Sequence, residues 1–366
     1  MSKLQYSSRI TDAFLVLLRT GLWEKDLESL SYFPLTFEEW HDVYQLALCQ
    51  TVSGIVYRGI LRLPDHLFPP EDILLRWMIR ADAVERKNRR MNEVVNELCS
   101  IFKDKGIRTV LQKGQGIASL YEWPFLRECG DIDLYFLNMK ERRMADLFIR
   151  QQGIRTSKGA DGSIHYEWKG VTVEHHSRLL DLYRPFLQGY LNKLEKQIGF
   201  TTVRLWKEGD SEVTVASPVL NLLMLNAHIL KHALGLGVGL RQLCDMARAY
   251  YKWHDTMKMH ELCEIYEKTG LSKWSNLLHS VLVEYLGVPA SCLPDKGGLE
   301  SPLPLFHIIQ RGGNFGQSDA CCLVSKGWQR KFLTAQSFFR NARFAFRYAP
   351  WEGVGMVSTL LKGQAR

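Results

Sequence analysis

Apolar residues recur at helical spacing through the first part of the chain. Thr36 and Glu39 form a capping box that predicts a helix start, and Pro69-Pro70-Glu71 predicts the start of a second, longer helix. The apolar stripe of the longer helix consists of Ile73, Leu74, Trp77, Met78, Ala81 and Val84, continued by Met91, Val94, Val95, Leu98, Ile101 and Phe102. We therefore expect an N-terminal helical region over residues 1–84, from which the long helix leads into a first strand.

The periodicity changes to that of strands in the middle of the chain. Ile107–Gln112 is an apolar run that ends at a glycine-rich turn, and Asp131–Phe136 alternates between polar and apolar residues. Ile164–Trp168 and Val171–His176 alternate as well, and Lys169-Gly170 between them suits a hairpin turn. These four segments predict a small mixed β-sheet.

Helical spacing separates and follows these strands. A helix is expected over Met139–Gln152, so the order of strands and helices predicts an α+β core over residues 85–216 with helices on one side of the sheet. From there helical spacing returns and predicts a C-terminal helical region over residues 217–366. Within it, residues 287–316 are rich in Gly and Pro and are expected to be irregular.

The net charge of +8 and the isoelectric point near 9.0 suit an anionic ligand such as a nucleotide or RNA. On the long helix, however, Arg86 and Arg89 follow Asp82 and Glu85, which favours a solvated, ion-paired face over a nucleic-acid groove. At the C-terminus a core helix with a basic outer face is the first interpretation, and a surface that touches RNA or membrane is the second. The residues concerned are Phe332, Phe338, Phe339, Phe344 and Phe346 with Lys331, Arg340, Arg343 and Arg347.

Length, hydropathy and cysteine usage set the class of protein. A chain of 366 residues with 46% hydrophobic content is long enough for more than one core. The apolar runs at residues 13–18 and 219–230 are shorter than the roughly 20 residues that a membrane span needs, and no signal peptide is expected. The eight cysteines show no C-x-x-C spacing. We expect reduced thiols and a cytoplasmic location without stable membrane insertion.

Three acidic residues are the leading candidates for chemistry. Alternation places Asp131 and Asp133 on one face of their strand, and two carboxylates at this spacing repel each other unless a cation lies between them. Glu174 joins them if its strand lies next to theirs, with Glu167 as the second choice. Such a set suits two Mg²⁺ ions, because oxygen ligands are what Mg²⁺ prefers. The alternative is a polar strand end with solvated carboxylates.

A glycine-rich turn precedes the acidic strand. Gly114 and Gly116 allow backbone N–H groups to approach a phosphate closely, and Ile117–Tyr121 can begin a helix whose N-terminus favours anions. By itself such a pair of glycines most often only turns the chain.

The residues from Leu111 to Phe136 resemble a known group of enzymes. The strand and glycine turn, the D-x-D strand and the later acid resemble the nucleotidyltransferase superfamily typified by DNA polymerase β. More narrowly, the segment is similar to an uncharacterised bacterial nucleotidyltransferase family that reads L-K-G-x-A, Y-x-x-P-x-x-R and G-D-I-D-L, followed by V-D-L-H and a helical motif. The matching residues here are Lys113, Gly114, Tyr121, Pro124, Arg127, Gly130, Asp131 and Asp133, then Glu174 and His176, and more weakly His228, His232, Gly239, Arg241 and Asp245.

The resemblance implies a polymerase β-like core and a Mg²⁺-dependent nucleotidyltransferase that moves a nucleoside monophosphate from an NTP such as ATP to an acceptor hydroxyl. The acceptor is left open between a small molecule, an RNA end and a protein side chain. Two Mg²⁺ ions, or Mn²⁺ in their place, are the expected cofactors. The implied metal and catalytic residues are Asp131, Asp133 and Glu174, supported by His176, and the implied nucleotide or phosphate ligands are Lys113, Gly114, Gln115, Arg127 and Arg241.

Some of these positions allow other interpretations. Gln115 stands where the superfamily has Gly or Ser, and Glu174 stands where the narrower family has Asp, which leaves open a catalytically degenerate nucleotide-binding module. Arg127 is as well suited to a structural ion pair as to a triphosphate, and Arg241 and Asp245, four residues apart, are spaced to pair with each other.

Histidines outside the acidic set give a further hypothesis. His228 and His232 share a helix face, where packing is favoured over zinc binding because the Glu of H-E-x-x-H is missing. A metal-dependent phosphohydrolase that uses His228 with His254-Asp255 is the last alternative.

Overall fold

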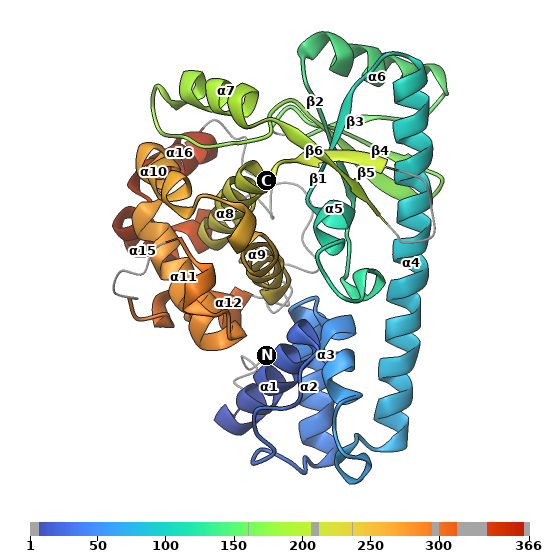
Figure 1. Cartoon of the computed structure of the whole chain (residues 1–366), viewed down its shortest axis with the longest axis vertical. Helices are drawn as coiled ribbons and strands as arrows, with labels where there is room; N and C mark the ends of the chain where they lie inside the picture. Colours follow the sequence, from blue (N-terminus) through green and yellow to red (C-terminus); the bar gives the residue numbers. More distant parts are fainter. Residues whose placement is uncertain are drawn as a thin grey trace.

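Helix α4 (Glu71–Asp104) connects the N-terminal helices to the β-sheet. The computed structural model describes residues 7–159, 161–205, 212–235, 237–294, 300–312 and 335–361. Within these ranges α4 is unbroken for 34 residues, which corresponds to about 50 Å, and it runs along one side of the molecule (Figure 1). Because α4 crosses residue 84, the chain passes from the N-terminal region into the core inside one helix.

The N-terminal helices form a compact group at one end of α4. They are α1 (Ser8–Trp23), α2 (Phe37–Cys49) and α3 (Ser53–Ile60), and the capping box of Thr36 and Glu39 at the start of α2 is confirmed. Two glycines let α1 and α3 approach closely. A Cβ added to Gly21 would lie 1.9 Å from the carbonyl oxygen of Ile55, and one added to Gly59 would lie 2.0 Å from that of Leu17.

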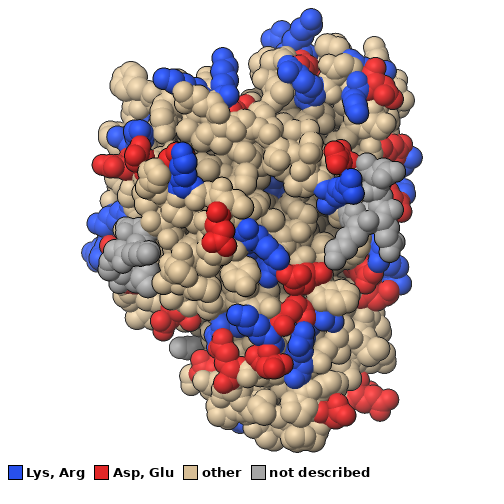
Figure 2. Space-filling model, in the orientation of Figure 1, with Lys and Arg blue, Asp and Glu red and all other residues tan. Residues whose placement is uncertain are grey.

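The apolar stripe predicted for α4 is buried along most of its length, with Met78 as an exposed exception. The solvated interpretation of its charged side is confirmed, because Arg86, Arg89 and Arg90 are exposed and ion-paired. Arg86 lies 2.5 Å from Asp82, and Arg89 lies 2.7 Å from Glu85. On the face shown in Figure 2, basic and acidic side chains are interspersed and gather into no large patch of one sign.

The described strands form one mixed sheet with the order β3-β4-β5-β2-β1-β7-β6 (Figure 1). β2 lies between β5, to which it is parallel, and β1, to which it is antiparallel. β7 lies parallel to the other edge of β1 and pairs with β6. The strands are β1 (Thr109–Gln112), β2 (Ile132–Phe136), β3 (Ser157–Lys158), β4 (Ile164–Trp168), β5 (Val171–His176), β6 (Phe200–Arg204) and β7 (Glu212–Ala216).

The predicted alternation along β2 is confirmed, but the expectation of an open polar face is wrong. Ile132, Leu134 and Phe136 pack with α4 in one core, whereas Tyr135 packs with the C-terminal helices in another. Every residue of β2 is buried, including Asp133. A strand in the middle of a sheet that is covered on both faces has no solvated side, so the carboxylate of Asp133 is enclosed.

Local turn chemistry explains the connections of the core. Lys169 and Gly170 both have positive φ, 49° and 78°, as a two-residue hairpin between β4 and β5 requires. The predicted helix after β2 is α6 (Met139–Gln151), whose N-cap Asn138 accepts from the backbone N–H of Glu141. A five-residue helix, α5 (Gly114–Ala118), follows β1 directly.

The C-terminal region is helical, and its helices lie beside the other face of the sheet (Figure 1). The expectation that residues 287–316 are irregular is wrong for one part, where a helix buries Leu305 and Ile309. Of the C-terminal aromatics, Phe338 is buried and Phe339 is exposed, while Phe332 and Lys331 lie outside the described residues. The helices are α7 (Leu187–Ile198), α8 (Pro218–Leu234), α9 (Leu240–Trp253), α10 (Met259–Thr269), α11 (Ser272–Leu286), α12 (Leu303–Gly312), α15 (Ala342–Tyr348) and α16 (Pro350–Leu361).

Four single 3-10 turns complete the described elements, at Asp65–Leu67, Pro124–Leu126, His254–Thr256 and Ala290–Cys292. Among the helices of the described ranges, none combines the length and the apolar character that a membrane crossing requires.

Candidate active site

Parallel pairing of β2 and β5 brings two of the predicted acids together. Asp133 is the register partner of Glu174, and both side chains lie on the sheet face that the C-terminal helices cover. His176 joins them, with Nε2 2.6 Å from Oδ1 of Asp133 and 3.5 Å from Oε2 of Glu174. Ligand atoms of these three residues lie within 4.8 Å of one another. The prediction that the strand of Glu174 lies next to that of Asp133 is confirmed.

Lys113 supplies a positive charge to this cluster. It stands between β1 and α5 with φ 47°, a backbone conformation that costs a residue with a side chain some strain. Its Nζ lies 3.2 Å from Oδ2 of Asp133, and the side chain is mostly buried. The structure therefore places the charge of Lys113 at the carboxylates and not on the surface.

The three carboxylates influence one another. Burial by itself would raise the pKa of Asp133, but the charge of Lys113 and the hydrogen bond with His176 hold it well below its usual range. Burial raises the pKa of Asp131, and the charge of Asp133 raises it further. Burial followed by the charges of Asp133 and Asp131 likewise raises the pKa of Glu174. One carboxylate is therefore firmly ionised, and two resist ionisation.

Asp131 lies at the edge of the cluster. It precedes the first residue of β2, is partly exposed and is not among the three residues whose ligand atoms converge. Its pKa nevertheless responds to Asp133, Lys113 and Arg241, so it faces the same region. The second choice, Glu167, pairs with Thr172 nearer the hairpin turn and is exposed.

His165 belongs to the site although the sequence analysis did not select it. It is the β4 partner of Glu174, and its Nδ1 lies 2.8 Å from Oε1 of that residue. Its Nε2 lies 2.8 Å from Oγ of Ser163, which donates to Asp161 at 2.6 Å. A signal was present: counting outward from the turn at residues 169 and 170 pairs position 165 with position 174.

The glycine turn is present, but the helix that follows it begins at Gly114 and ends at Ala118, so the prediction that Ile117–Tyr121 begins this helix is wrong. Gly114 has φ 42° and begins α5, and Gly116 lets the helix lie against the sheet, because a Cβ there would be 3.1 Å from Cγ1 of Val215. Gln115 is buried, and within the described part of the chain its amide oxygen and nitrogen have no hydrogen-bond partner. An unsatisfied buried amide is costly, so this position suits a polar ligand or a water molecule.

Arg127 forms the structural ion pair that was its alternative role. Its Nε donates to Oδ1 of Asp245 at 3.0 Å, a second nitrogen pairs with Oδ2, and Tyr121 donates to the same carboxylate at 2.8 Å. The expected pairing of Arg241 with Asp245 is not what the structure shows. Arg241 instead donates to the carbonyl oxygen of Glu128 at 2.9 Å. Its charge opposes the rise in the pKa of Asp131 that burial and Asp133 cause.

The other histidines do not assemble a metal site within the described residues. The rings of His228 and His232 pack edge to face at 4.3 Å, and burial followed by the charge of Lys113 lowers the pKa of His228 well below its ordinary value. His254 lies 3.2 Å from Asp255, whose side chain is solvent-exposed. Among the described residues, one group of three side chains lies close enough together to hold a metal ion. It consists of Asp133, Glu174 and His176. The basis for the phosphohydrolase hypothesis is therefore weak.

Carboxylates on neighbouring strands of a mixed sheet, beside a Lys-Gly turn that opens a short helix, define a nucleotidyltransferase-like protein. The chain belongs to the family described as uncharacterised nucleotidyltransferase, whose family model matches residues 37–287. The resemblance seen in the residues is thus confirmed. No curated protein matches the sequence. A solved structure, an antigenic nucleotidyltransferase-like protein from Paracoccidioides brasiliensis, matches with 12% identity and a TM-score of 0.33, covering 56% of this chain and 96% of that one.

Proposed function

We propose that the protein transfers a nucleoside monophosphate from an NTP to an acceptor hydroxyl with the help of Mg²⁺. The observation that carries the proposal is the convergence of Asp133, Glu174 and His176 next to Lys113. Family membership supports nucleotidyl transfer in general terms. The divalent ion and the hydroxyl acceptor are what the side chains add to it.

The donor set fits a divalent cation. Two carboxylates and an imidazole within 4.8 Å of one another offer the oxygen ligands that Mg²⁺ prefers and a nitrogen that Mn²⁺ also accepts. The pKa values of Asp131 and Glu174 are raised first by burial and then by the neighbouring carboxylates, and a bound cation would oppose both effects. Asp133, Glu174 and His176 would hold the ion, with Asp131 at the side. When bound, the ion would stabilise the charge of the phosphates.

The chain's own residues account for the remaining requirements of transfer. The acceptor oxygen attacks the α-phosphorus, the bond from this phosphorus to the bridging oxygen breaks, and pyrophosphate leaves with the bonding electrons. Glu174, which His165 orients at 2.8 Å, accepts the hydroxyl proton. Lys113 faces the negative charge that develops on the leaving side, where Arg241 lies close enough to assist.

Calorimetric titration of each NTP in the presence of Mg²⁺ tests the proposal. Asp133→Asn removes the ionised centre of the cluster and should abolish metal-dependent NTP binding. Glu167→Gln is the matched control, since it removes an exposed acid from the same hairpin and should bind like the wild type. Equal NTP binding by Asp133→Asn and wild type would show that the assignment is wrong.

The degenerate module remains the second candidate because of two observations. Lys113 pairs with Asp133 at 3.2 Å, and Gln115 occupies the turn with an amide that has no hydrogen-bond partner among the described residues. This candidate predicts NTP binding that persists in EDTA. Metal-dependent binding together with pyrophosphate release in the presence of any acceptor would exclude it.

A further inference from the structure

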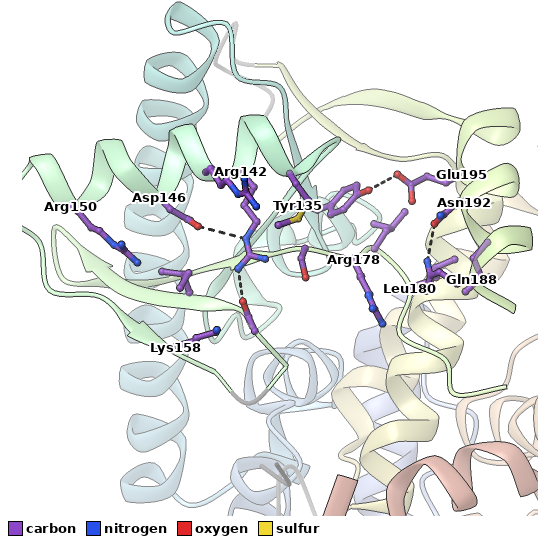
Figure 3. Close-up of a pocket in the computed structure, with 17 residues that line it drawn as sticks. Tyr135, Arg142, Asp146, Arg150, Lys158, Arg178, Leu180, Gln188, Asn192 and Glu195 are labelled. Carbon is purple, nitrogen blue, oxygen red and sulfur yellow. Dashed lines mark hydrogen bonds and ion pairs between the residues drawn. The ribbon is translucent and has the colours of Figure 1, made fainter. Parts of the chain in front are cut away.

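A basic cavity of about 670 Å³ lies beside the carboxylate cluster, where β2 and β5 end. Its walls come from α6, α7, the β3–β4 connection and the segment that follows β5 (Figure 3). Five basic residues line it, namely Arg142, Arg143, Arg150, Lys158 and Arg178, against two acidic ones, Asp146 and Glu195. Its volume is within the range of small-molecule sites.

Both acids of the cavity are already engaged. Asp146 lies 2.7 Å from Nδ1 of the buried His175 and also pairs with Arg142 across 3.7 Å. Glu195 accepts a hydrogen bond from the hydroxyl of Tyr135 at 2.6 Å (Figure 3). Asp146 compensates Arg142 in part and Glu195 is directed to Tyr135, so five bases against two acids leave an excess of positive charge.

The bases differ in how firmly they are held. Arg142 is buried and pinned, since it donates to the carbonyl oxygen of Gly162, while its Nε makes no hydrogen bond to any described residue. Arg150, Lys158 and Arg178 are exposed and have no acid within ion-pair distance in the described part of the chain. In Figure 3, Lys158 points toward Arg142 from β3, Arg150 lies further along α6 beyond Asp146, and Arg178 extends from the segment after β5 away from Arg142. A fixed guanidinium with free cations around it suits a multivalent oxyanion.

The cavity is aligned with the carboxylate cluster. Tyr135 lies two residues after Asp133 on the same face of β2, and Arg178 lies two residues after His176 at the end of β5. At about 3.3 Å per strand residue, the cavity begins roughly 7 Å beyond the site of transfer. This separation suits a molecule that places a hydroxyl at the carboxylates and a phosphate among the bases.

We propose that the cavity binds the acceptor, and that the acceptor is a small molecule carrying a phosphate ester. The acceptor role rests on the proposed function, whereas phosphate-ester binding by itself does not. A nucleic-acid acceptor is less consistent with the structure, because the bases of α4 are ion-paired and the face in Figure 2 carries no continuous basic track.

Calorimetry on the full chain provides the test. The probes are glycerol 3-phosphate, ribose 5-phosphate and glucose 1-phosphate, each beside its unphosphorylated parent. At least one ester should bind wild type while its parent does not, and binding should weaken about tenfold or more in Lys158→Gln/Arg178→Gln. The matched control is Lys140→Gln, which removes a base from α6 outside the cavity and should leave binding unchanged.

Each other outcome is informative. The cavity proposal is overturned if no ester binds, or if the double variant binds the esters as well as Lys140→Gln does. It is also overturned if Mg·ATP displaces the ester, or if a single-stranded RNA binds at the same bases more tightly than every ester. Ester binding that persists in Asp133→Asn while NTP binding is absent from wild type would refute the transferase and keep the cavity. With a functional transferase, the bound ester should be consumed with pyrophosphate release, and the double variant should raise KM more than it lowers kcat. An ester that binds without being consumed would refute the acceptor role.

Discussion

Asp245→Ala tests whether Arg127 is a structural residue of this protein. The side chains of Arg127 and Asp245 are 5% and 2% exposed, so the ion pair between the residue after the Pro124–Leu126 turn and α9 is enclosed. Burial by itself would lower the pKa of Arg127, yet the charge of Asp245 raises it well above its ordinary value. Because an arginine side chain stays protonated in proteins, the guanidinium keeps its charge after Asp245 is removed, and it remains shielded from solvent.

The expected cost follows from this enclosure. Breaking a buried pair by removing one partner costs about 3–5 kcal/mol, because the other charge is left uncompensated. Asp245→Ala also removes the acceptor of the Tyr121 hydroxyl. Replacing both charges, as in Arg127→Met/Asp245→Leu, should cost less than the single change, since apolar residues of similar volume avoid the unpaired charge.

Urea unfolding followed by tryptophan fluorescence measures these free energies. Asp255→Ala is the control, an exposed acid whose loss should change stability by less than about 0.5 kcal/mol. A cost below about 1 kcal/mol for Asp245→Ala would refute the reasoning. NTP binding gives a second readout. If Arg127→Met/Asp245→Leu folds but no longer binds Mg·NTP, Arg127 contacts phosphate after all.

Two further predictions concern an anchor of the segment after β5 and a neighbour of the acidic cluster. Glu352 is buried on α16 and accepts from the backbone N–H of Tyr183 at 2.8 Å, and burial raises its pKa from 4.5 to about 7. The unfolded chain ionises this group at lower pH, so its contribution is fully present below pH 4.5 and about 3 kcal/mol is lost as pH rises through 7. Glu352→Gln should remove that slope from urea midpoints measured across this range, and an unchanged slope would show that the carboxyl is ionised when folded. His165→Gln should lower kcat for pyrophosphate release about tenfold with NTP binding retained, because Glu174 loses its orienting partner. Loss of NTP binding instead would assign His165 to substrate binding.

Local pattern was sufficient for the centre of the fold. Alternation in β2 and β5, with a two-residue turn at Lys169-Gly170, fixed which side chains share a face. Whether β5 lies next to β2 was left open, and the structure shows that it does, with Glu174 opposite Asp133. The same counting reaches His165, which the sequence analysis passed over because it considered acids and glycines first. The alternation of apolar and polar residues along a strand is a local property, so it can be recognised in a single sequence.

Long-range pairing was not predictable in this way. β6 and β7 complete the sheet from residues 200–216, and β7 lies parallel to β1 although about a hundred residues separate them. β6 is largely exposed and carries little apolar signal. Two arginines, Arg127 and Arg241, were candidates to pair with Asp245. Sequence spacing favoured Arg241, which lies four residues away on α9. The fold instead selects Arg127, because tertiary packing and not helix spacing decides which guanidinium is buried with it.

The electrostatics of the cluster explain why chemistry is assigned there and not to the other buried charges. The pair of Arg127 with Asp245 is balanced, since one guanidinium faces one carboxylate with both oxygens engaged. Around Asp133, by contrast, three carboxylates interact with one another. Lys113 lowers the pKa of Asp133, but the pKa values of Asp131 and Glu174 remain raised despite the nearby bases. A fold that buries three carboxylates close to one another, and holds Lys113 at positive φ beside them, tolerates destabilisation that a bound cation would relieve. The acidic cluster is therefore the place where binding free energy can be gained, and the basic cavity next to it has the opposite imbalance. A substrate with a phosphate at one end and a hydroxyl brought to a metal at the other would satisfy both at once.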